Sequence, residues 1–532
     1  MIYLPRINSI FWIFFTFSLP SACQDHTDRS STVDVLHYRF EIDLNDSTDV
    51  LAGQAEVDIL FREETREFYL DLIGLSGHGT GMVIDRIESG GRNCQYVHAD
   101  DKILFSLNGI SAGDTCKFLI QYHGIPADGL IISENCFGDR TFFGDNWPDR
   151  ARYWLPMVDH PSDKATVEFL VEAPGHYSIV SVGELKQEYR VNERVFSLWE
   201  CTVPLPTKLM VIGVSPFEVQ RMTSGSGIPV STWVYPQNKE AGFSDYSVAV
   251  GPLDFFESYI APYPYVKLAN VQSRTRFGGM ENASCIFYHE RTVTGKGGNE
   301  KLFAHEIAHQ WFGDAVTEGD WHHVWLSEGF ATYLADMYLE HAYGRNTFIS
   351  SLLEEREEVL KYSRRRMAPV VDTTLPVSVW LLNPNSYEKA AWVLHMLRRQ
   401  LGDELFRRCI RAFFQKFKFG NAVTPDFRIV VDSVSGGNFE PFFQQWIFTA
   451  GHPVLSADWH FENGVIKIRI RQHQEQSLFS FPLDIRVNFE KGTGIEKTLQ
   501  VSLSDEVFSI PSVLKPCSVE LDPDHWLLFE NY

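Results

Sequence analysis

The sequence of 532 residues predicts an α+β multidomain protein with three consecutive regions. Apolar and polar residues alternate through the first region and again through the last, which is typical of half-buried strands. The region between them has helical spacing with capping residues at its segment ends. We therefore expect an N-terminal antiparallel β-sheet domain, an α-rich domain and a C-terminal β-sandwich, at residues 27–222, 223–451 and 453–532 respectively.

The first region carries the clearest strand patterns. Tyr38, Phe40 and Ile42 alternate with charged residues, and the same pattern returns at 54–60. Strands continue in segments such as "KFLIQYHG", "ATVEFLVEAPG" and "HYSIVSVG". This density of short alternating segments predicts a large, mostly antiparallel sheet.

The middle region is punctuated by helix start and stop signals. One helix is expected to begin at Asn299 and to stop at Gly313. Two others are expected at 327–344 and 386–402, each beginning with Ser and ending with Gly. Helices at this density predict an α-rich domain.

The last region returns to strands. Asn463-Gly464 is a two-residue hairpin signal, followed by Ile466, Ile468 and Ile470 alternating with basic residues. Residues 481–490 repeat the alternation. Together these segments predict a small β-sandwich.

Composition narrows the class of protein. Hydrophobic residues make up 44% of the chain and aromatic residues 14%, which excludes an intrinsically disordered protein. The formal net charge of −22 argues against nucleic acid as a partner.

The N-terminus resembles an export signal. Residues 1–22 hold one basic residue, an apolar run shorter than a membrane span, and small residues. "LPSAC" also resembles a lipoprotein cleavage box, which would lipidate Cys23 and attach the protein to a membrane. We expect an exported protein that is periplasmic, secreted or lipid-anchored.

The other seven cysteines are scattered. A Cys94–Cys116 disulfide stays open as an alternative to isolated thiols.

The segment "HEIAHQW" carries the chemistry. His305 and His309 are four residues apart, so both imidazoles lie on one face of a helix and can reach one cation. Glu306 is placed to act on a water at that cation. Two core histidines with hydrogen-bond partners would give the same local pattern.

A third candidate ligand lies on the next predicted helix. Glu328 follows His309 after a gap of 18 residues, in "WLSEGFATYLAD". A His₂Glu set leaves a coordination position for water, as a catalytic zinc requires. An ordinary acidic residue in a first helical turn is the alternative. The sequence therefore predicts one Zn²⁺ held by His305, His309 and Glu328.

The run "HEIAHQWFGDAVTEGDWHHVWLSEGFATYLAD" resembles the zinc signature of the aminopeptidase N family, the gluzincin aminopeptidases. The resemblance implies a thermolysin-like catalytic domain and the hydrolysis of N-terminal peptide bonds. It also covers "DNWPDRARYWLPMVDHPSDKATVEF" and "FQQWIFTAGHPVL", and so most of the chain. The chain looks like a short bacterial member without the long helical C-terminal domain.

"FGGMENAS" resembles the substrate-binding strand of that family. A strand edge offers backbone hydrogen bonds to an extended peptide, and glycines permit close approach. The resemblance assigns the carboxylate of Glu281 to the substrate's α-ammonium. It assigns the rest of the strand to the peptide itself: Gly278, Gly279, Met280 and Asn282.

Two further residues enter through the resemblance. "SYEKAAWVLHML" is similar to a helix start that carries an oxyanion-stabilising tyrosine, here Tyr387, with Ala390 at a position that is usually glycine. A phenol there could donate a hydrogen bond to the developing alkoxide. Many members have Gln where this chain has Asp145, and Asp145 is expected to contact the substrate amine.

The expected protein is a monomeric zinc aminopeptidase acting on peptides with a free N-terminus. Glu306 is expected to take the proton of the attacking water and pass it to the leaving amine. Two alternatives stay open. One is an endopeptidase or epoxide hydrolase on the same scaffold, and the other is a non-catalytic peptide-binding protein.

Overall fold

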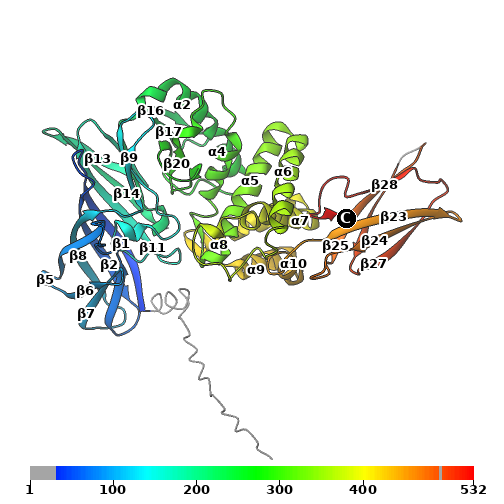
Figure 1. Cartoon of the computed structure of the whole chain (residues 1–532), viewed down its shortest axis with the longest axis horizontal. Coiled ribbons are helices and arrows are strands. Elements are labelled where there is room, and N and C mark those ends of the chain that lie inside the picture. The colour runs from blue at the N-terminus through cyan, green and yellow to red at the C-terminus, as the bar shows by residue number, and fades with distance from the viewer. Residues whose placement is uncertain (1–31, 491–493) are drawn as a thin grey trace, which may run out of the picture.

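The computed structural model describes residues 32–490 and 494–532. Strands dominate the N-terminal part, helices the middle and strands the C-terminal part, as expected (Figure 1). The predicted signal segment and Cys23 lie outside the described residues. None of the described helices is both long and apolar enough to span a membrane.

The N-terminal part is built around an eight-stranded sheet with the order β13-β14-β11-β1-β2-β8-β4-β5. Its core is made by alternation: Tyr38, Phe40 and Ile42 of β1 are buried, and so are their counterparts on β11. The pairing is antiparallel except between β1 and β11, which run parallel. The strands are β1 Val33–Asp43, β2 Leu51–Phe61, β4 Gly81–Ser89, β5 Arg92–Asn93, β8 Thr115–Ile125, β11 Lys164–Pro174, β13 Glu184–Val191 and β14 Arg194–Pro206.

Two smaller sheets accompany this large one. The first has the order β12-β15-β10-β9 and the second β3-β7-β6. Their strands are β3 Thr65–Asp71, β6 Gln95–Ala99, β7 Lys102–Ile110, β9 Leu130–Glu134, β10 Arg140–Gly144, β12 Ser178–Ser181 and β15 Ile212–Ser215. The 3-10 turn η2, Thr207–Leu209, connects β14 to β15 and is completely buried.

A five-stranded sheet opens the middle part and positions the site. Its order is β16-β17-β18-β20-β19, so β19 is an edge strand. The strands are β16 Glu218–Thr223, β17 Pro229–Val234, β18 Leu268–Ser273, β19 Gly279–Met280 and β20 Cys285–His289. The short helices α2, Lys239–Tyr246, and α3, Val250–Tyr259, lie between β17 and β18 in the chain.

The helices that follow carry the predicted ligands. The helix expected at Asn299–Gly313 is α4, Glu300–His309, and α5 covers Trp325–Tyr343. Asn299 precedes α4 but does not cap it with its side chain, whose Nδ2 donates to Thr292 O. The remaining helices are α6 Arg345–Ser363, α7 Ala390–Leu401, α8 Asp403–Phe417, α9 Thr424–Ser435 and α10 Glu440–Trp446. A parallel pair, β21 Val316–Glu318 and β22 Gly420–Ala422, completes this part.

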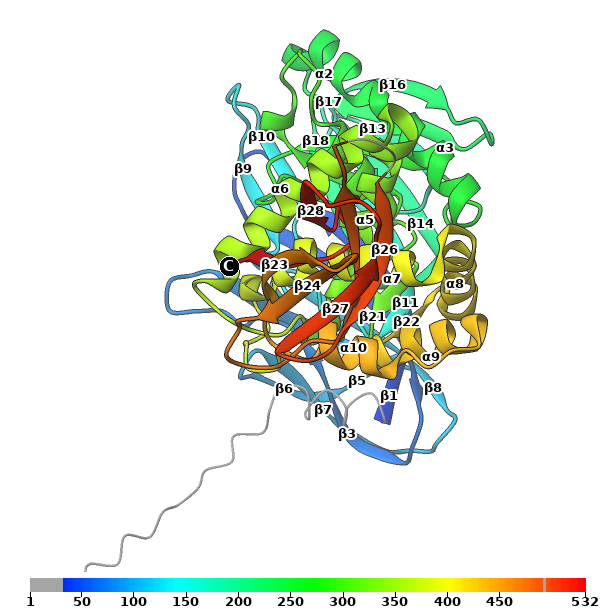
Figure 2. The same ribbon diagram turned by 90° about the vertical axis from the view of Figure 1, so that its right-hand side faces the viewer.

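The C-terminal strands form two sheets with the orders β27-β24-β23-β29 and β26-β25-β28. The expected hairpin is present, with positive φ at Asn463 and Gly464 between β23 and β24. Viewed from that end, these strands lie over α7 and α10 (Figure 2). The strands are β23 Val454–Glu462, β24 Val465–Gln472, β25 Phe481–Asn488, β26 Ile495–Val501, β27 Asp505–Pro511, β28 Ser518–Leu521 and β29 Glu530–Asn531.

The seven cysteines from Cys94 onward are all free thiols, including Cys94 and Cys116. The isolated-thiol alternative therefore describes this structure.

Candidate metal centre and catalytic cavity

Helix α4 has two functional faces, because residues four apart stack on the same side of a helix. Phe303, Ile307 and Trp311 are fully buried and anchor the segment. On the adjacent face, His305 and His309 point together toward Glu328 of α5, with ring centroids 4.6 Å apart. The segment "HEIAHQW" thus has buried core residues on one face and the candidate metal ligands on another.

The three predicted ligand atoms form a compact triangle. Nε2 of His305 and Nε2 of His309 are 3.0 Å apart, and Glu328 Oε2 lies 3.4 Å and 3.3 Å from them. Zinc bonds of about 2.0–2.2 Å at tetrahedral angles place ligand atoms about 3.3–3.5 Å apart. The donor set and its spacing therefore fit one Zn²⁺. Burial raises the pKa of Glu328, but the two imidazoles outweigh burial and hold it well below its ordinary value, so the ligand is ionised.

Residues behind the triad orient its imidazoles. His309 Nδ1 lies 3.1 Å from Phe312 O and 3.1 Å from Ser327 Oγ. Thr332 Oγ1 lies 3.4 Å from His305 Nδ1. Such outer contacts fix which ring nitrogen faces a metal.

Glu306 lies beside the triad and is 5% exposed. Burial raises its pKa well above the ordinary value, which strengthens it as a proton acceptor. Gly279 packs directly on it: a Cβ added at Gly279 would lie 2.6 Å from Glu306 Cγ and nearer still to the carboxyl group. The Gly-Gly pair therefore provides space for the candidate base.

The edge strand β19 and the residues after it form one wall of the site. Gly279 and Met280 pair only with β20 on one side, which leaves the other edge facing the cavity. Gln310 ties this wall to the metal-binding segment, because its Nε2 donates to Glu281 O and its Oε1 accepts from Ser284 N. The strand edge and the candidate ligands are thus held in fixed register.

Tyr387 lines the same cavity from the π-helical turn Asn385–Lys389. Its ring stacks over the His305 imidazole, with centroids 5.9 Å apart and planes 12° apart. Burial and the neighbouring Glu328 raise the pKa of Tyr387 well above its ordinary value. The phenol is therefore protonated at neutral pH and is a hydrogen-bond donor.

A cavity of about 410 Å³ unites these groups. Glu281 and the triad line it together with Glu306 and Tyr387. Sequence reasoning gave no role to several of its lining residues, although Trp147, Thr332 and Glu388 stand inside segments quoted for the resemblance. These lining residues are Trp147, Lys301, Leu302, Thr332, Glu355 and Glu388.

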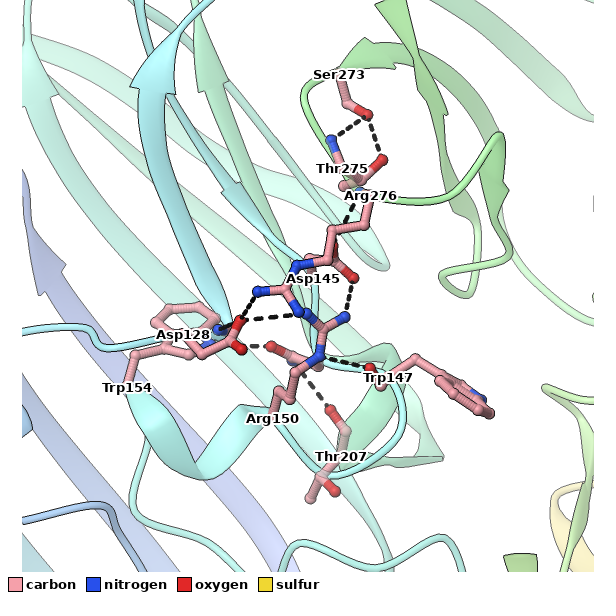
Figure 3. A network of polar contacts seen from close by, with 11 residues as sticks. Asp128, Asp145, Trp147, Arg150, Trp154, Thr207, Ser273, Thr275 and Arg276 are labelled. Atoms are coloured by element: carbon pink, nitrogen blue, oxygen red, sulfur yellow. Dashed lines mark hydrogen bonds and ion pairs between the residues drawn. The ribbon is translucent and has the colours of Figure 1, made fainter. Parts of the chain in front are cut away.

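Two predicted substrate contacts do not line this cavity. Asn282 is completely buried next to the cavity wall. Asp145 is also completely buried, and its Oδ1 accepts from Arg150 Nη2 at 2.6 Å while its Oδ2 accepts from Arg276 N at 3.1 Å (Figure 3). The expected contact between Asp145 and a substrate amine is therefore absent from this geometry, because Arg150 and Arg276 occupy both carboxylate oxygens. Instead, Asp145 anchors the segment that leads into β19.

Comparison with known proteins places two long parts of the chain in one family. The Peptidase M1 N-terminal domain matches residues 35–209 and the Peptidase family M1 domain matches residues 245–446. Glutamyl aminopeptidase from Rattus norvegicus is 29% identical over 476 residues, which are 82% of this chain and 50% of the relative.

Two further relatives come from distant organisms. Leucyl aminopeptidase from Saccharolobus solfataricus is 23% identical over 86% of this chain and 59% of its own length. Aminopeptidase M1 from Arabidopsis thaliana is 28% identical over 58% of this chain and 37% of its own length. The chain spans about half the length of the rat relative and less than two thirds of the other two. The two domain matches and these similarities confirm the resemblance read from the motifs: the chain belongs to peptidase family M1.

Proposed function

We propose that this protein is a zinc-dependent aminopeptidase that hydrolyses the N-terminal peptide bond of peptides. One observation carries the proposal. The ligand triad, the buried Glu306 and the carboxylate of Glu281 converge on a single cavity beside an open strand edge. This arrangement suits a peptide that lies along β19 with its ammonium at Glu281 and its first peptide bond at the triad.

Zinc, when bound by His305, His309 and Glu328, supplies a Lewis acid that polarises a carbonyl and makes water more acidic. The protein's own groups perform the remaining steps. Glu306 takes the proton of the attacking water and donates it to the leaving amine. Tyr387 donates a hydrogen bond to the oxygen on which negative charge develops. Glu281 holds the α-ammonium, and the backbone of β19 keeps the substrate extended.

The carboxylate of Glu281 favours an exopeptidase over an endopeptidase. It is 5% exposed and lines the cavity beside Glu306 and His309. An ionised carboxylate in this position matches an ammonium group and disfavours an uncharged amide, which would leave the charge unpaired. The candidate ligands, base and tyrosine are all present, which disfavours a purely binding role.

The test uses purified protein with measured metal content. Hydrolysis of an aminoacyl-p-nitroanilide is compared with hydrolysis of its N-acetylated analogue. We expect one zinc per chain and cleavage of the free-amine substrate alone. Glu306→Gln should retain zinc and lose turnover. Equal cleavage of the acetylated analogue would overturn the exopeptidase assignment, and an active Glu306→Gln would overturn the assigned base.

We also propose that the protein is exported and monomeric, and that its domains span residues 27–222, 223–451 and 453–532. N-terminal sequencing and mass spectrometry of protein purified from its native cells would distinguish cleavage after residue 22 from lipidation of Cys23. Limited proteolysis should cut near residues 222 and 452 if the boundaries are correct.

A further inference from the structure

A buried lysine from the N-terminal part lies behind the amine end of the cavity. Lys208 belongs to the turn η2 and is 1% exposed. Its Nζ is 2.7 Å from Glu318 Oε1 and 3.9 Å from Glu281 Oε1. Lys208 is thus the cation shared by two buried carboxylates, of which one lines the cavity.

The two oxygens of Glu281 have different surroundings. Oε1 is buried, and within the described part of the chain no hydrogen bond reaches it. Its nearest cationic partner there is Lys208, which lies on the side away from the cavity. The ion pair draws Oε1 inward, so Oε2 remains the oxygen available to a ligand in the cavity.

The charges around Glu281 also leave this carboxylate available to a ligand. Lys208 makes its short contact with Glu318, so it compensates the charge of Glu281 only in part. Although burial opposes it, Glu318 and Glu281 raise the pKa of Lys208 above its ordinary value, so the lysine stays protonated. A substrate ammonium would supply the missing positive charge of this group.

Hydrogen bonds hold the chain on both sides of Lys208. Asn146 Nδ2 donates to Thr207 O and to Met210 O, on either side of Lys208, and Thr207 Oγ1 donates to Asp159 Oδ1 at 2.7 Å. The lysine Nζ also lies 5.4 Å from the centroid of the Trp321 ring, a cation–π contact. The hydrogen bonds fix the chain around Lys208, while Glu318 and the Trp321 ring fix the position of its Nζ.

We propose that Lys208 is a positioning residue for amine recognition: it fixes the Glu281 carboxylate with one oxygen toward the cavity and leaves part of its charge for the substrate's α-ammonium. This inference rests on the proposed function. It adds a residue from the N-terminal β region to the substrate-binding apparatus, and it makes Glu318 the residue that limits how tightly Lys208 engages Glu281.

The test compares two inhibitors on the metal-loaded full chain: leucine hydroxamate and 4-methylpentanohydroxamic acid, which differ only by the α-amine. For Lys208→Met we expect a Ki for the amine-bearing compound about tenfold higher, the equivalent of one pKa unit, because the Glu281 carboxylate is then no longer fixed with Oε2 toward the cavity. A lower Ki would mean that Lys208 only neutralises Glu281 and would overturn the positioning role. The Ki of the des-amino compound should not change. Lys208→Arg should recover most of the amine preference, because it keeps the positive charge.

Two further variants separate this role from general stability. Lys164→Met removes another buried lysine, whose Nζ donates to the backbone carbonyls of residues 314, 315 and 420 and whose charge interacts with Glu318 and Lys208, so it should change the ratio of the two Ki values less than Lys208→Met does. Glu318→Gln frees Lys208 to pair fully with Glu281, so it should also weaken the amine-bearing inhibitor selectively, even if Lys208→Met fails to fold.

The outcomes are distinct. Equal loss for both inhibitors, or no loss for either, in Lys208→Met and Glu318→Gln would overturn the role of Lys208. A wild-type protein that binds both hydroxamates equally would instead count against the proposed aminopeptidase function, because Glu281 itself would not be reading the amine.

Discussion

Gly279 and Glu306 are in such close contact that any side chain at this strand position would have to displace the glutamate. A Cβ at Gly279 would approach Glu306 Cγ to 2.6 Å, whereas one at Gly278 would meet only Leu302 Cδ2, at 4.0 Å. The second glycine of "FGGMEN" is therefore needed to make room for Glu306, as well as for any close approach of a substrate.

Gly279→Ala should displace Glu306 and lower kcat by about a hundredfold, since a shift of about 1 Å in a catalytic group has an effect of that size. Metal content should stay at the wild-type value, because the ligands are not touched. The comparison variant is Gly278→Ala, which should lose less activity. The explanation fails if Gly278→Ala is as damaging as Gly279→Ala.

Tyr387→Phe should lower kcat by about 10²–10³-fold, the usual effect of removing one oxyanion donor. KM and bound zinc should change little, because the ring and its stacking on His305 remain. Tyr333→Phe serves as control: it removes another buried hydroxyl, 3.0 Å from His395 Nδ1, and should affect stability only. A Tyr387→Phe protein with wild-type kcat would exclude the oxyanion role.

Ser327→Ala should weaken metal binding by about tenfold, a typical effect of losing an outer contact to a ligand. His309 Nδ1 would keep Phe312 O as its partner, so the site should not be abolished. Competition with a chelator measures the affinity. Ser215→Ala, a buried serine on β15, is the matched control. Unchanged zinc affinity in Ser327→Ala would show that Phe312 O alone orients the imidazole.

Asp145→Asn distinguishes an anchor from a substrate contact. Removing the charge of Asp145 should lower the free energy of unfolding by about 1–3 kcal/mol, measured by urea denaturation, because Arg150 keeps Asp128 at 3.2 Å as a second partner. Arg150→Met should have a similar effect. A raised KM without loss of stability would restore the role of Asp145 as an amine ligand that its motif position implies.

His452 should make the stability of the protein depend on pH. It is 3% exposed, and burial together with Lys389 lowers its pKa to about 4, more than Glu530 at 3.6 Å offsets. Between about pH 4 and pH 6.5 the unfolded chain therefore binds a proton that the folded chain does not, so stability rises with pH in this window.

The contribution of His452 is fully present above pH 6.5 and is lost as the pH falls to about 4, a change of about 3 kcal/mol. Thermal unfolding of wild type and His452→Gln across this range is the measurement. The variant should have a shallower slope. Parallel pH curves for the two proteins would assign the acid sensitivity to other groups.

The cluster of candidate metal ligands could be predicted from the sequence, because the pattern that marks it lies within one short stretch. Two histidines one helical turn apart share a face whatever the tertiary structure, and Glu328 follows at a spacing that a motif records. The strand alternations were equally readable, since burial of one sheet face imposes them. The sequence could not give the parallel pairing of β1 with β11, because both partners alternate in the same way in either orientation.

The sequence did not reveal contacts between distant segments. Asp145 was assigned by its motif position, but its partner Arg276 lies 131 residues away and takes its second oxygen. Lys208 meets Glu318 across 110 residues, and nothing in "PLPTKLM" indicates that a lysine there is buried. Such pairs are defined only when the N-terminal sheets pack against the helices.

On the proposed function, the free edge of β19 limits which chain ends can bind at the site. A polypeptide can dock there only if its first residues are extended and their amide groups are not already bonded. The N-terminus of a stable helix meets neither condition, and a proline near the end lacks a donor. On the proposed function, the rate at which a folded protein is trimmed would depend on how often its N-terminus unfolds. The flexibility of the terminus would therefore select substrates before any side chain is recognised.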